Sequence, residues 1–460
     1  MTKDDVYKLV AESATFGNLG LFIGAGFSLA VNESSFNFEP LSWIELLKSI
    51  CRDNEITWDS NSDGTGKITP PELQKEFASC PEVASQICKI ISRKAEVSLA
   101  EATNMFKKQV CNITSWYSNK SQRDIYGKIL KSLLPNWIVT TNYDLILETL
   151  LPEESVSLSP RNEFVFNRSK IPIFHLHGVC TDFETIIITN EDYIALSRPH
   201  NYRMERLSLM FSESTTLMIG YSIGDPNVLT ALDWSKNVYD EQVDEAKKYP
   251  HAIIQLVYTE TPKYEPYETD NGIIILETNS IKVSLGKMIS LINEFKETQK
   301  LKNDELNSLR EKYLNPTVTD INDFLTNIKK RHEILKEIIE QKEIVIATET
   351  YLSEIFKTAW KKTEPSGAFD EYSKVLDIFL DIFKTFELKK FPPSIYMLFV
   401  SNFEKLSFYI NDIMGTSYKA FENWKQNKDS IAEENKKEIS GISSWNWNIK
   451  KLLKRSNFSN

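Results

Sequence analysis

Residues 19–28 read LGLFIGAGFS, an apolar run that ends at Gly24 and continues directly into Gly-Ala-Gly-Phe-Ser. A buried strand does not require two glycines at its end, whereas a bound phosphate can approach the main chain only where no Cβ stands in the way. The stretch therefore favours a strand followed by a phosphate-binding turn. A tight turn without a ligand explains the same residues, because the third glycine of the G-x-G-x-x-G pattern is absent.

Further apolar segments rich in Ile, Val and Leu read as strands, and helical spacing separates them. They are WIVTT (137–141), IPIFHLHG (171–178), TTLMIGYSIGD (215–225), HAIIQLVY (251–258) and GIIILET (272–278), with TIIIT (185–189) as a strand or a strand and turn. Such strands favour an α/β fold, with a Rossmann-like, mainly parallel sheet covered by helices on both faces. A helical insertion is expected at about residues 53–132, beginning with a polar loop at 53–68.

The composition changes near residue 285. Beyond that point no segment reads as a strand, and apolar residues recur at three- and four-residue steps among dense Lys and Glu. The sequence predicts a first domain at 1–285 and an α-helical domain at 286–460. The second domain is expected to act in regulation, oligomerisation or partner binding, although its apolar faces are explained equally well by a core of its own.

The totals exclude several classes of protein. A net charge of −10 argues against nonspecific nucleic-acid binding. The five cysteines show no C-x-x-C spacing, which predicts a reducing compartment and no zinc site. The polar N-terminus does not read as a signal peptide, and no apolar run is long enough to span a bilayer. A cytoplasmic protein is expected.

Polar clusters follow four of the strands: GAGFS (24–28), TTNYD (140–144), HLHG (175–178) and GYSIGDP (220–226). The carboxyl ends of parallel strands are where open α/β sheets bind ligands. Each cluster also has a simpler explanation, such as a turn closed by Asp225 and Pro226, a helix cap at Asn142 or a first-turn acid at Asp144. A metal pair of His175 and His177 lacks a supporting third ligand. We therefore expect His175 in the core and His177 at the site.

The order Gly-Ala-Gly-x-Ser, Thr-x-Asn-x-Asp, His-Gly and Gly-x-Ser resembles that of sirtuins. Over roughly residues 15–285, the chain is more similar to the SIR2-like domain of bacterial anti-phage defence proteins. The features that carry this closer resemblance are TTNYD, GYSIGDP, ITNEDY after His-Gly, and Trp43 with Leu46 and Leu47 after the first loop.

The resemblance implies roles for individual residues toward NAD. Asn142 corresponds to the residue that contacts the nicotinamide-side ribose and orders a water molecule, and His177 corresponds to the general base. The residues that the resemblance assigns to NAD binding are Gly24, Ala25, Gly26, Ser28, Asp144, Gly220, Ser222 and Asp225.

One departure from the deacetylating sirtuins bears on the reaction. Their zinc module carries two cysteine pairs, whereas this chain has only Cys180 between His177 and Gly220. The resemblance therefore implies a gated NAD⁺ glycohydrolase that yields nicotinamide and ADP-ribose, with NAD as substrate and no zinc, acting by NAD depletion after phage infection. The chain is expected to form a homo-oligomer or to bind a partner defence protein or a phage-derived trigger. It is not expected to bind a membrane. An NAD or ADP-ribose sensor that regulates a partner, an ADP-ribosyltransferase and a deacylase remain as alternatives.

Overall fold

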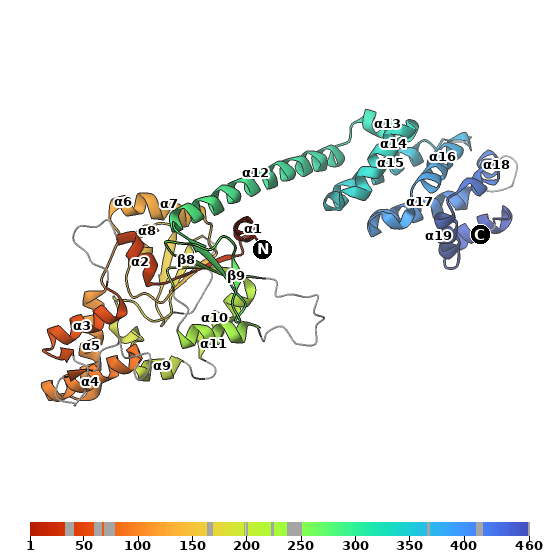
Figure 1. Ribbon diagram of the computed structural model, residues 1–460. Coiled ribbons are helices and arrows are strands. Elements are labelled where there is room, and N and C mark those ends of the chain that lie inside the picture. The colour runs from red at the N-terminus through yellow and green to blue at the C-terminus, as the bar shows by residue number, and fades with distance from the viewer. Residues whose placement is uncertain are drawn as a thin grey trace. The chain divides into compact units, whose positions relative to one another are not determined.

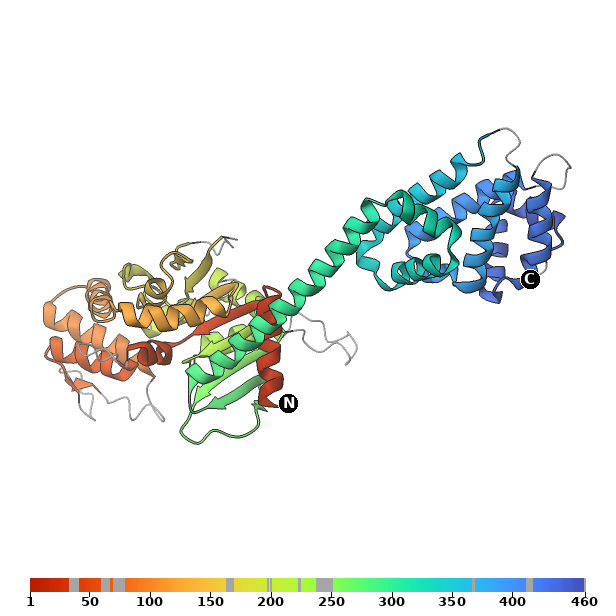
Figure 2. The same ribbon diagram turned by 90° about the horizontal axis from the view of Figure 1, so that it is seen from above.

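The computed structural model divides the chain into two compact units, Met1–Glu297 (unit 1) and Thr298–Asn460 (unit 2). The residues that it describes are 1–32, 41–58, 67–68, 79–162, 169–196, 198, 201–221, 225–236, 251–365, 369–410 and 417–458. Figures 1 and 2 show both units from two directions.

Unit 1 is built on an eight-stranded sheet with the order β5-β6-β4-β1-β7-β8-β10-β9. All neighbouring strands are parallel except β10 and β9. The strands are β1 (Leu19–Ile23), β4 (Trp137–Thr140), β5 (Ser155–Leu158), β6 (Ile171–His175), β7 (Thr215–Ile219), β8 (Ile253–Tyr258), β9 (Tyr267–Glu268) and β10 (Ile273–Thr278). The predicted Rossmann-like, mainly parallel sheet is confirmed.

Helices cover both faces of this sheet (Figure 1). Leu21 of β1 packs into one core with helices α1, α2, α7, α8 and α12, and its neighbour Phe22 packs into another with α10 and α11. This alternation explains why the strand is apolar throughout. The helices of unit 1 are α1 (Lys3–Thr15), α2 (Ala25–Asn32), α3 (Trp43–Asp53), α4 (Cys80–Ala95), α5 (Leu99–Ile113), α6 (Lys120–Gln122), α7 (Lys128–Ser132), α8 (Ile146–Leu150), α9 (Asn190–Leu196), α10 (Tyr202–Glu213), α11 (Pro226–Lys236) and the start of α12 (Ile281–Leu314).

The insertion is mainly helical, and α3, α4 and α5 share one core (Figure 1). Ser42 caps α3 in a capping box with Glu45, as the sequence predicts. Of the polar loop expected at 53–68, residues 59–66 lie outside the described residues. On either side of them the structure contains two two-residue strands, β2 (Thr57–Trp58) and β3 (Lys67–Ile68). They pair in parallel outside the main sheet.

The prediction of a strand over TIIIT is wrong. Residues Phe183–Thr185 form a 3₁₀ turn, and 186–189 have no regular structure. Ile186 and Ile188 are buried in the core of the insertion instead of the sheet. The backbone of this segment bonds to both main chain and side chains. The Ile187 N–H donates to the His177 carbonyl, Asp192 accepts from the Ile188 N–H, and Tyr143 donates to the Ile187 carbonyl.

The division between the units lies within α12, twelve residues beyond the expected boundary at 285. Leu285, Met288 and Ile292 at the start of this helix pack into the core of unit 1, and Leu306 and Tyr313 belong to the core of unit 2. The change in composition therefore marks the end of the strands, whereas the change of core comes later on the same helix.

Unit 2 is helical throughout its described residues, as predicted. Its helices are the end of α12 and α13 (Val318–Thr326), α14 (Ile328–Glu340), α15 (Val345–Lys361), α16 (Phe369–Thr385), α17 (Pro393–Tyr409), α18 (Tyr418–Asn427), α19 (Glu433–Ser443) and α20 (Trp447–Arg455). Aromatic rings from several of these helices pack together, among them Phe356, Phe379, Phe403 and Trp424. Within the described parts of both units, no helix has the length and apolar character needed to cross a bilayer.

Candidate functional site

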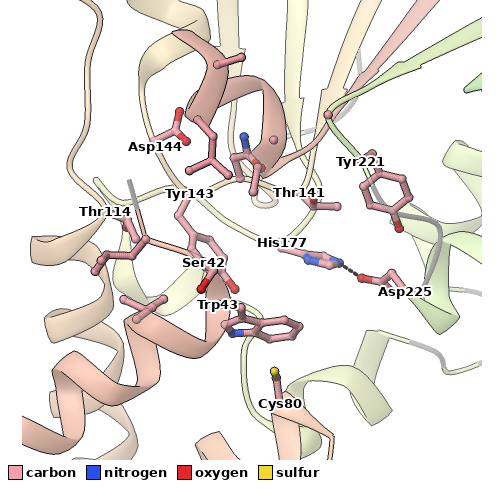
Figure 3. Close-up of a pocket in the computed structure, with 18 of the residues that line it drawn as sticks. Ser42, Trp43, Cys80, Thr114, Thr141, Tyr143, Asp144, His177, Tyr221 and Asp225 are labelled. Carbon is pink, nitrogen blue, oxygen red and sulfur yellow. Dashed lines mark ion pairs between the residues drawn. The ribbon is translucent and has the colours of Figure 1, made fainter. Parts of the chain in front are cut away.

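A cavity of about 1620 Å³ lies at the carboxyl edge of the sheet. Its wall includes residues that follow β1, β4, β6, β7 and β10, together with the end of β8. The neighbours of β1 along the sheet are β4 on one side and β7 on the other, so the strand order reverses at β1. Open α/β sheets bind ligands at such a reversal. Figure 3 shows part of this cavity, with Trp43 at the start of α3 and Cys80 at the start of α4.

The two glycines after β1 lie against the turn after β7. A Cβ at Gly24 would be 2.5 Å from the Gly220 carbonyl oxygen, and one at Gly26 would be 2.9 Å from the same atom. The Gly26 N–H donates to this carbonyl at 2.8 Å, and the Phe27 N–H donates to the Gly24 carbonyl at 3.0 Å. The glycines are thus required for contact between two main chains. These two N–H groups are engaged within the protein.

Residues 25–28 also differ locally from the predicted loop, because they form the first turn of α2. Ala25 and Gly26 line the cavity at this helix N-terminus. A helix N-terminus carries a partial positive charge, which favours an anionic group even where individual N–H groups are engaged.

Ser28, Asn142 and Asp144 form one chain of hydrogen bonds. The Asn142 Nδ2 donates to Ser28 Oγ at 2.9 Å, and that hydroxyl donates to Asp144 Oδ2 at 2.9 Å. The backbone N–H of Asn142 donates to Thr140 Oγ1, and the backbone N–H of Ile146 donates to Asp144 Oδ1. Since α8 begins only at Ile146, Asn142 is not its cap. The chain fixes the two side chains that enter the cavity after β4.

Asp144 is a buried carboxyl group, and burial raises its pKa to about 6. The hydrogen bonds from the Ile146 N–H and Ser28 Oγ favour the ionised form and act against this shift. The carboxyl group therefore changes its protonation state near neutral pH.

Replacing Asp144 with asparagine is expected to remove a pH dependence from the stability of unit 1. In the unfolded chain this carboxyl titrates near 3.8, so the stability that it contributes is complete below that pH and is lost as the pH rises to about 6. The loss amounts to about 3 kcal/mol. Urea denaturation at about pH 4 and pH 7 should therefore show the variant gaining about 3 kcal/mol relative to wild type at the higher pH. Parallel pH profiles would contradict the raised pKa of Asp144.

The two histidines of HLHG have different surroundings. His175 is fully buried, with Nδ1 at 3.0 Å from the Asn142 carbonyl and Nε2 at 2.6 Å from Glu148 Oε1. Burial by itself lowers the pKa of His175, but the hydrogen bond and charge of Glu148 raise it above its usual value. His177 lies beyond the end of β6 and lines the cavity. The structure thus places His175 in the core and His177 at the site, as the sequence predicts.

His177 is buried beside Asp225, and its Nε2 lies 3.3 Å from Asp225 Oδ2 (Figure 3). This approach lacks hydrogen-bond geometry, and Nε2 has no hydrogen-bond partner among the described residues. Burial lowers the pKa of His177, the charge of Asp225 raises it, and the charge of Arg203 lowers it, with a net shift below the usual value. The imidazole is therefore neutral at neutral pH.

The structure brings most of the sequence-predicted site residues to this cavity. The ones on its wall are Ala25, Gly26, Asn142, Asp144, His177, Gly220 and Asp225. Gly24 and Ser28 do not line the cavity, but they bond to residues next to it or on its wall: the Gly24 N–H donates to the Ile219 carbonyl, and the Ser28 hydroxyl donates to Asp144. Ser222 lies outside the described residues.

Several cavity residues were not predicted as site residues. Trp43 Nε1, Tyr221 OH and Asn227 Nδ2 are buried and have no hydrogen-bond partner within the described part of the chain, and all three residues line the cavity. Trp43 also stacks on Tyr193, with ring centroids 6.2 Å apart. The sequence places Trp43 and Tyr193 in segments that resemble a family, but it does not indicate that they face a site, because that depends on how α3 and α9 pack at the carboxyl edge of the sheet.

The donor set at the cavity is not that of a metal centre. Within the ranges that the structure describes, no three His, Cys, Asp or Glu side chains gather closely enough to hold an ion. The buried Cys111 and Cys180 are free thiols, and burial raises the pKa of Cys180 to about 11. These thiols are therefore protonated at neutral pH.

Comparison with known families assigns the part of unit 1 that contains most of these residues. No curated protein matches the chain. The SIR2-like domain family matches residues 136–282, about a third of the chain, which includes Asn142, Asp144, His177, Gly220 and Asp225. The β1–α2 turn and the whole of the insertion at 53–132 precede the match. Residues 136–282 are therefore similar to the SIR2-like domain family, which belongs to a superfamily of NAD-using enzymes.

Proposed function

We propose that the protein is an NAD⁺ glycohydrolase, which cleaves NAD⁺ to nicotinamide and ADP-ribose. The observation that carries this proposal is the presence of Asn142, Asp144 and His177 on the wall of one cavity at the reversal of strand order. SIR2-like domains bind NAD, and this cavity is the natural place for it in unit 1.

The chemistry of the wall suits a dinucleotide. Four buried polar atoms at the cavity, on Trp43, His177, Tyr221 and Asn227, have no hydrogen-bond partner within the described residues. Buried polar groups are costly unless they are paired, so they favour a ligand with many donors and acceptors. The N-terminus of α2 provides positive potential for a pyrophosphate.

Asp144, Asn142 and His177 have different proposed roles in the cleavage of NAD⁺. In the substrate NAD⁺, cleavage of the N-glycosidic bond between nicotinamide and ribose develops positive charge on the ribose. Nicotinamide leaves as a neutral molecule. The Asp144 carboxylate provides negative charge at the cavity wall, and Asn142, held by Ser28, orients a water molecule without competing as a nucleophile. The neutral His177 accepts a proton from that water molecule or from a ribose hydroxyl.

The proposal favours hydrolysis over protein deacylation. The chain between His177 and Gly220 contains only Cys180, so it lacks the cysteine pairs of the zinc module that frames a peptide groove in deacetylating sirtuins. We extend the proposal to anti-phage defence by NAD depletion, on the resemblance alone. An enzyme of this kind must be gated, and the helical unit 2 is the proposed place for an oligomer contact, a partner protein or a trigger.

The direct test incubates the purified full-length protein with NAD⁺ and quantifies nicotinamide and ADP-ribose. Cleavage by Asn142→Ala is expected to be at least about tenfold slower than by wild type, while NAD⁺ binding measured by calorimetry is retained. Asn136→Ala is the matched control, because Asn136 is exposed and precedes β4, at the opposite edge of the sheet. It should cleave NAD⁺ at the wild-type rate.

Each other outcome identifies an alternative. NAD⁺ binding without cleavage, in the presence of infected-cell lysate as a source of triggers, would favour a sensor. Transfer of label from NAD⁺ to protein would indicate an ADP-ribosyltransferase, and nicotinamide release that requires an acylated peptide would indicate a deacylase. Any of these results would contradict the proposal that the protein is an NAD⁺ hydrolase.

A further inference from the structure

Three side chains from separate segments meet at the cavity, and one of them is the proposed base, His177. His177 follows β6, Tyr193 lies on α9, and Asp225 immediately precedes α11. Asp225 Oδ2 is 3.3 Å from His177 Nε2 and accepts a hydrogen bond from the Tyr193 hydroxyl at 3.3 Å. The Tyr193 ring stands edge-on to the imidazole, with centroids 5.4 Å apart.

We propose that Asp225 is a positioning residue for His177, whose carboxylate stands beside Nε2 as the counter-ion of the imidazolium that forms when the base takes up a proton. This inference rests on the proposed function and changes the role that the sequence implies for Asp225, from NAD contact to orientation of the base. The contact between Nε2 and the carboxylate lacks hydrogen-bond geometry, so Asp225 acts on the imidazole through its negative charge.

The two carboxylate oxygens of Asp225 have different surroundings. Its Oδ1 accepts from the Asn227 N–H at 2.9 Å and caps the first turn of α11. A cap needs one acceptor oxygen, and Asn or Ser serves as well as Asp. The cap therefore accounts for Oδ1 and fixes the carboxyl plane, which turns Oδ2 toward His177 and Tyr193.

The charges around His177 support the same role. The described titratable and charged groups that face it are Asp225, Tyr193 and Arg203, and the Arg203 guanidinium donates to the Leu176 carbonyl beside it. Burial and the Arg203 charge both oppose protonation of the imidazole, and Asp225 is the group that favours it. Without Asp225 the base would be weaker, and the imidazolium formed during proton transfer would lack a counter-ion.

The first experiment measures the titration of His177 in the full-length protein without NAD⁺. Histidine labelled with ¹³C at Cε1 gives one signal for each of the five histidines, and His177→Gln assigns the signal of interest. In Asp225→Asn, which keeps the helix cap, the His177 pKa is expected to fall by about one unit. Asp233→Asn is the matched control, because Asp233 is exposed on the same helix, and it should leave the signal unchanged.

The second experiment uses NAD⁺ cleavage to separate positioning from binding. For Asp225→Asn we expect kcat to fall about tenfold and the acidic limb of its pH profile to move to lower pH, with KM for NAD⁺ nearly unchanged. A raised KM with unchanged kcat would overturn the proposal in favour of NAD contact. An unchanged His177 pKa in a folded Asp225→Asn or Asp225→Ser protein would also overturn it. The titration needs no turnover, so a failure of the proposed function would be recognised separately, by the absence of cleavage in wild type.

Discussion

NAD⁺ cleavage by His177→Ala is expected to be about 10²- to 10⁴-fold slower than cleavage by wild type, which is the range for loss of a positioned general base. His177 is the histidine of unit 1 that lines the cavity, and burial holds its pKa below the usual value, so it is ready to accept a proton at neutral pH. Single-turnover assays of nicotinamide release would measure the effect on the chemical step.

The control for this variant is His251→Gln. His251 precedes β8 at the opposite edge of the sheet, and its ring lies 3.3 Å from the Asn18 amide nitrogen. It should cleave NAD⁺ at the wild-type rate. Circular dichroism and NAD⁺ binding should be unchanged in both variants, so that a loss of rate reports on chemistry. Full activity in a folded His177→Ala protein would show that this residue is not the base.

The pH dependence of the wild-type rate provides an independent check. A base acts only when it is deprotonated, so kcat should be constant at neutral pH and fall as the pH drops through the pKa of His177. Because burial lowers that pKa, the fall is expected below about pH 6.5, the ordinary value for histidine. An acidic limb well above this value would assign the titration to another group.

Gly220→Ala is expected to destabilise unit 1 by about 4 kcal/mol or more, which is at the upper end for a single substitution. Gly220 has φ +64°, a conformation that costs an alanine about 1–2 kcal/mol. The new Cβ would also lie 2.0 Å from the Phe27 nitrogen, so the turns after β1 and β7 would have to separate. Separation would break the hydrogen bond from the Gly26 N–H to the Gly220 carbonyl. Urea denaturation and the yield of folded protein would measure the loss.

Gly286→Ala is the matched control for this effect. Gly286 is exposed on α12 in the same unit, and a Cβ there would meet no atom within 4 Å. Alanine in the interior of a helix is more favourable than glycine by about 1 kcal/mol, so this variant should be slightly more stable than wild type. A Gly220→Ala protein of wild-type stability would show that the two turns are not in close contact.

The sequence predicts the central strands well because each is a short apolar run that is buried on both faces. The strands that it misses are polar or very short: SVSL of β5 and the two residues of β9 lie at the two edges of the sheet, where apolar residues are not required. The false strand TIIIT shows the opposite error. Its isoleucines are buried, but against helices of the insertion, and periodicity alone cannot tell these two environments apart.

The sequence also predicts which clusters gather at the site, because the carboxyl ends of parallel strands meet at one edge of the sheet. It does not reveal the contacts between them. Ser28 bonds Asp144 from 116 residues away, and Tyr193 on α9 bonds Asp225, the carboxylate beside His177. Each contact depends on how two elements pack, so the partner of Ser28 or of Tyr193 cannot be predicted from its residue type.

The amino-acid sequence by itself therefore determined the α/β class, the helical second half and the polar clusters after the strands, since all three follow from local patterns of apolar and polar side chains. The choice of individual site residues within those clusters came from the resemblance to a family. The tertiary structure alone assigned the glycines after β1 to the contact with Gly220, put the boundary between units within α12, and paired Asp225 with His177. The physical reason is that distances between atoms remote in sequence, and the burial that shifts a pKa, exist only once the chain has packed.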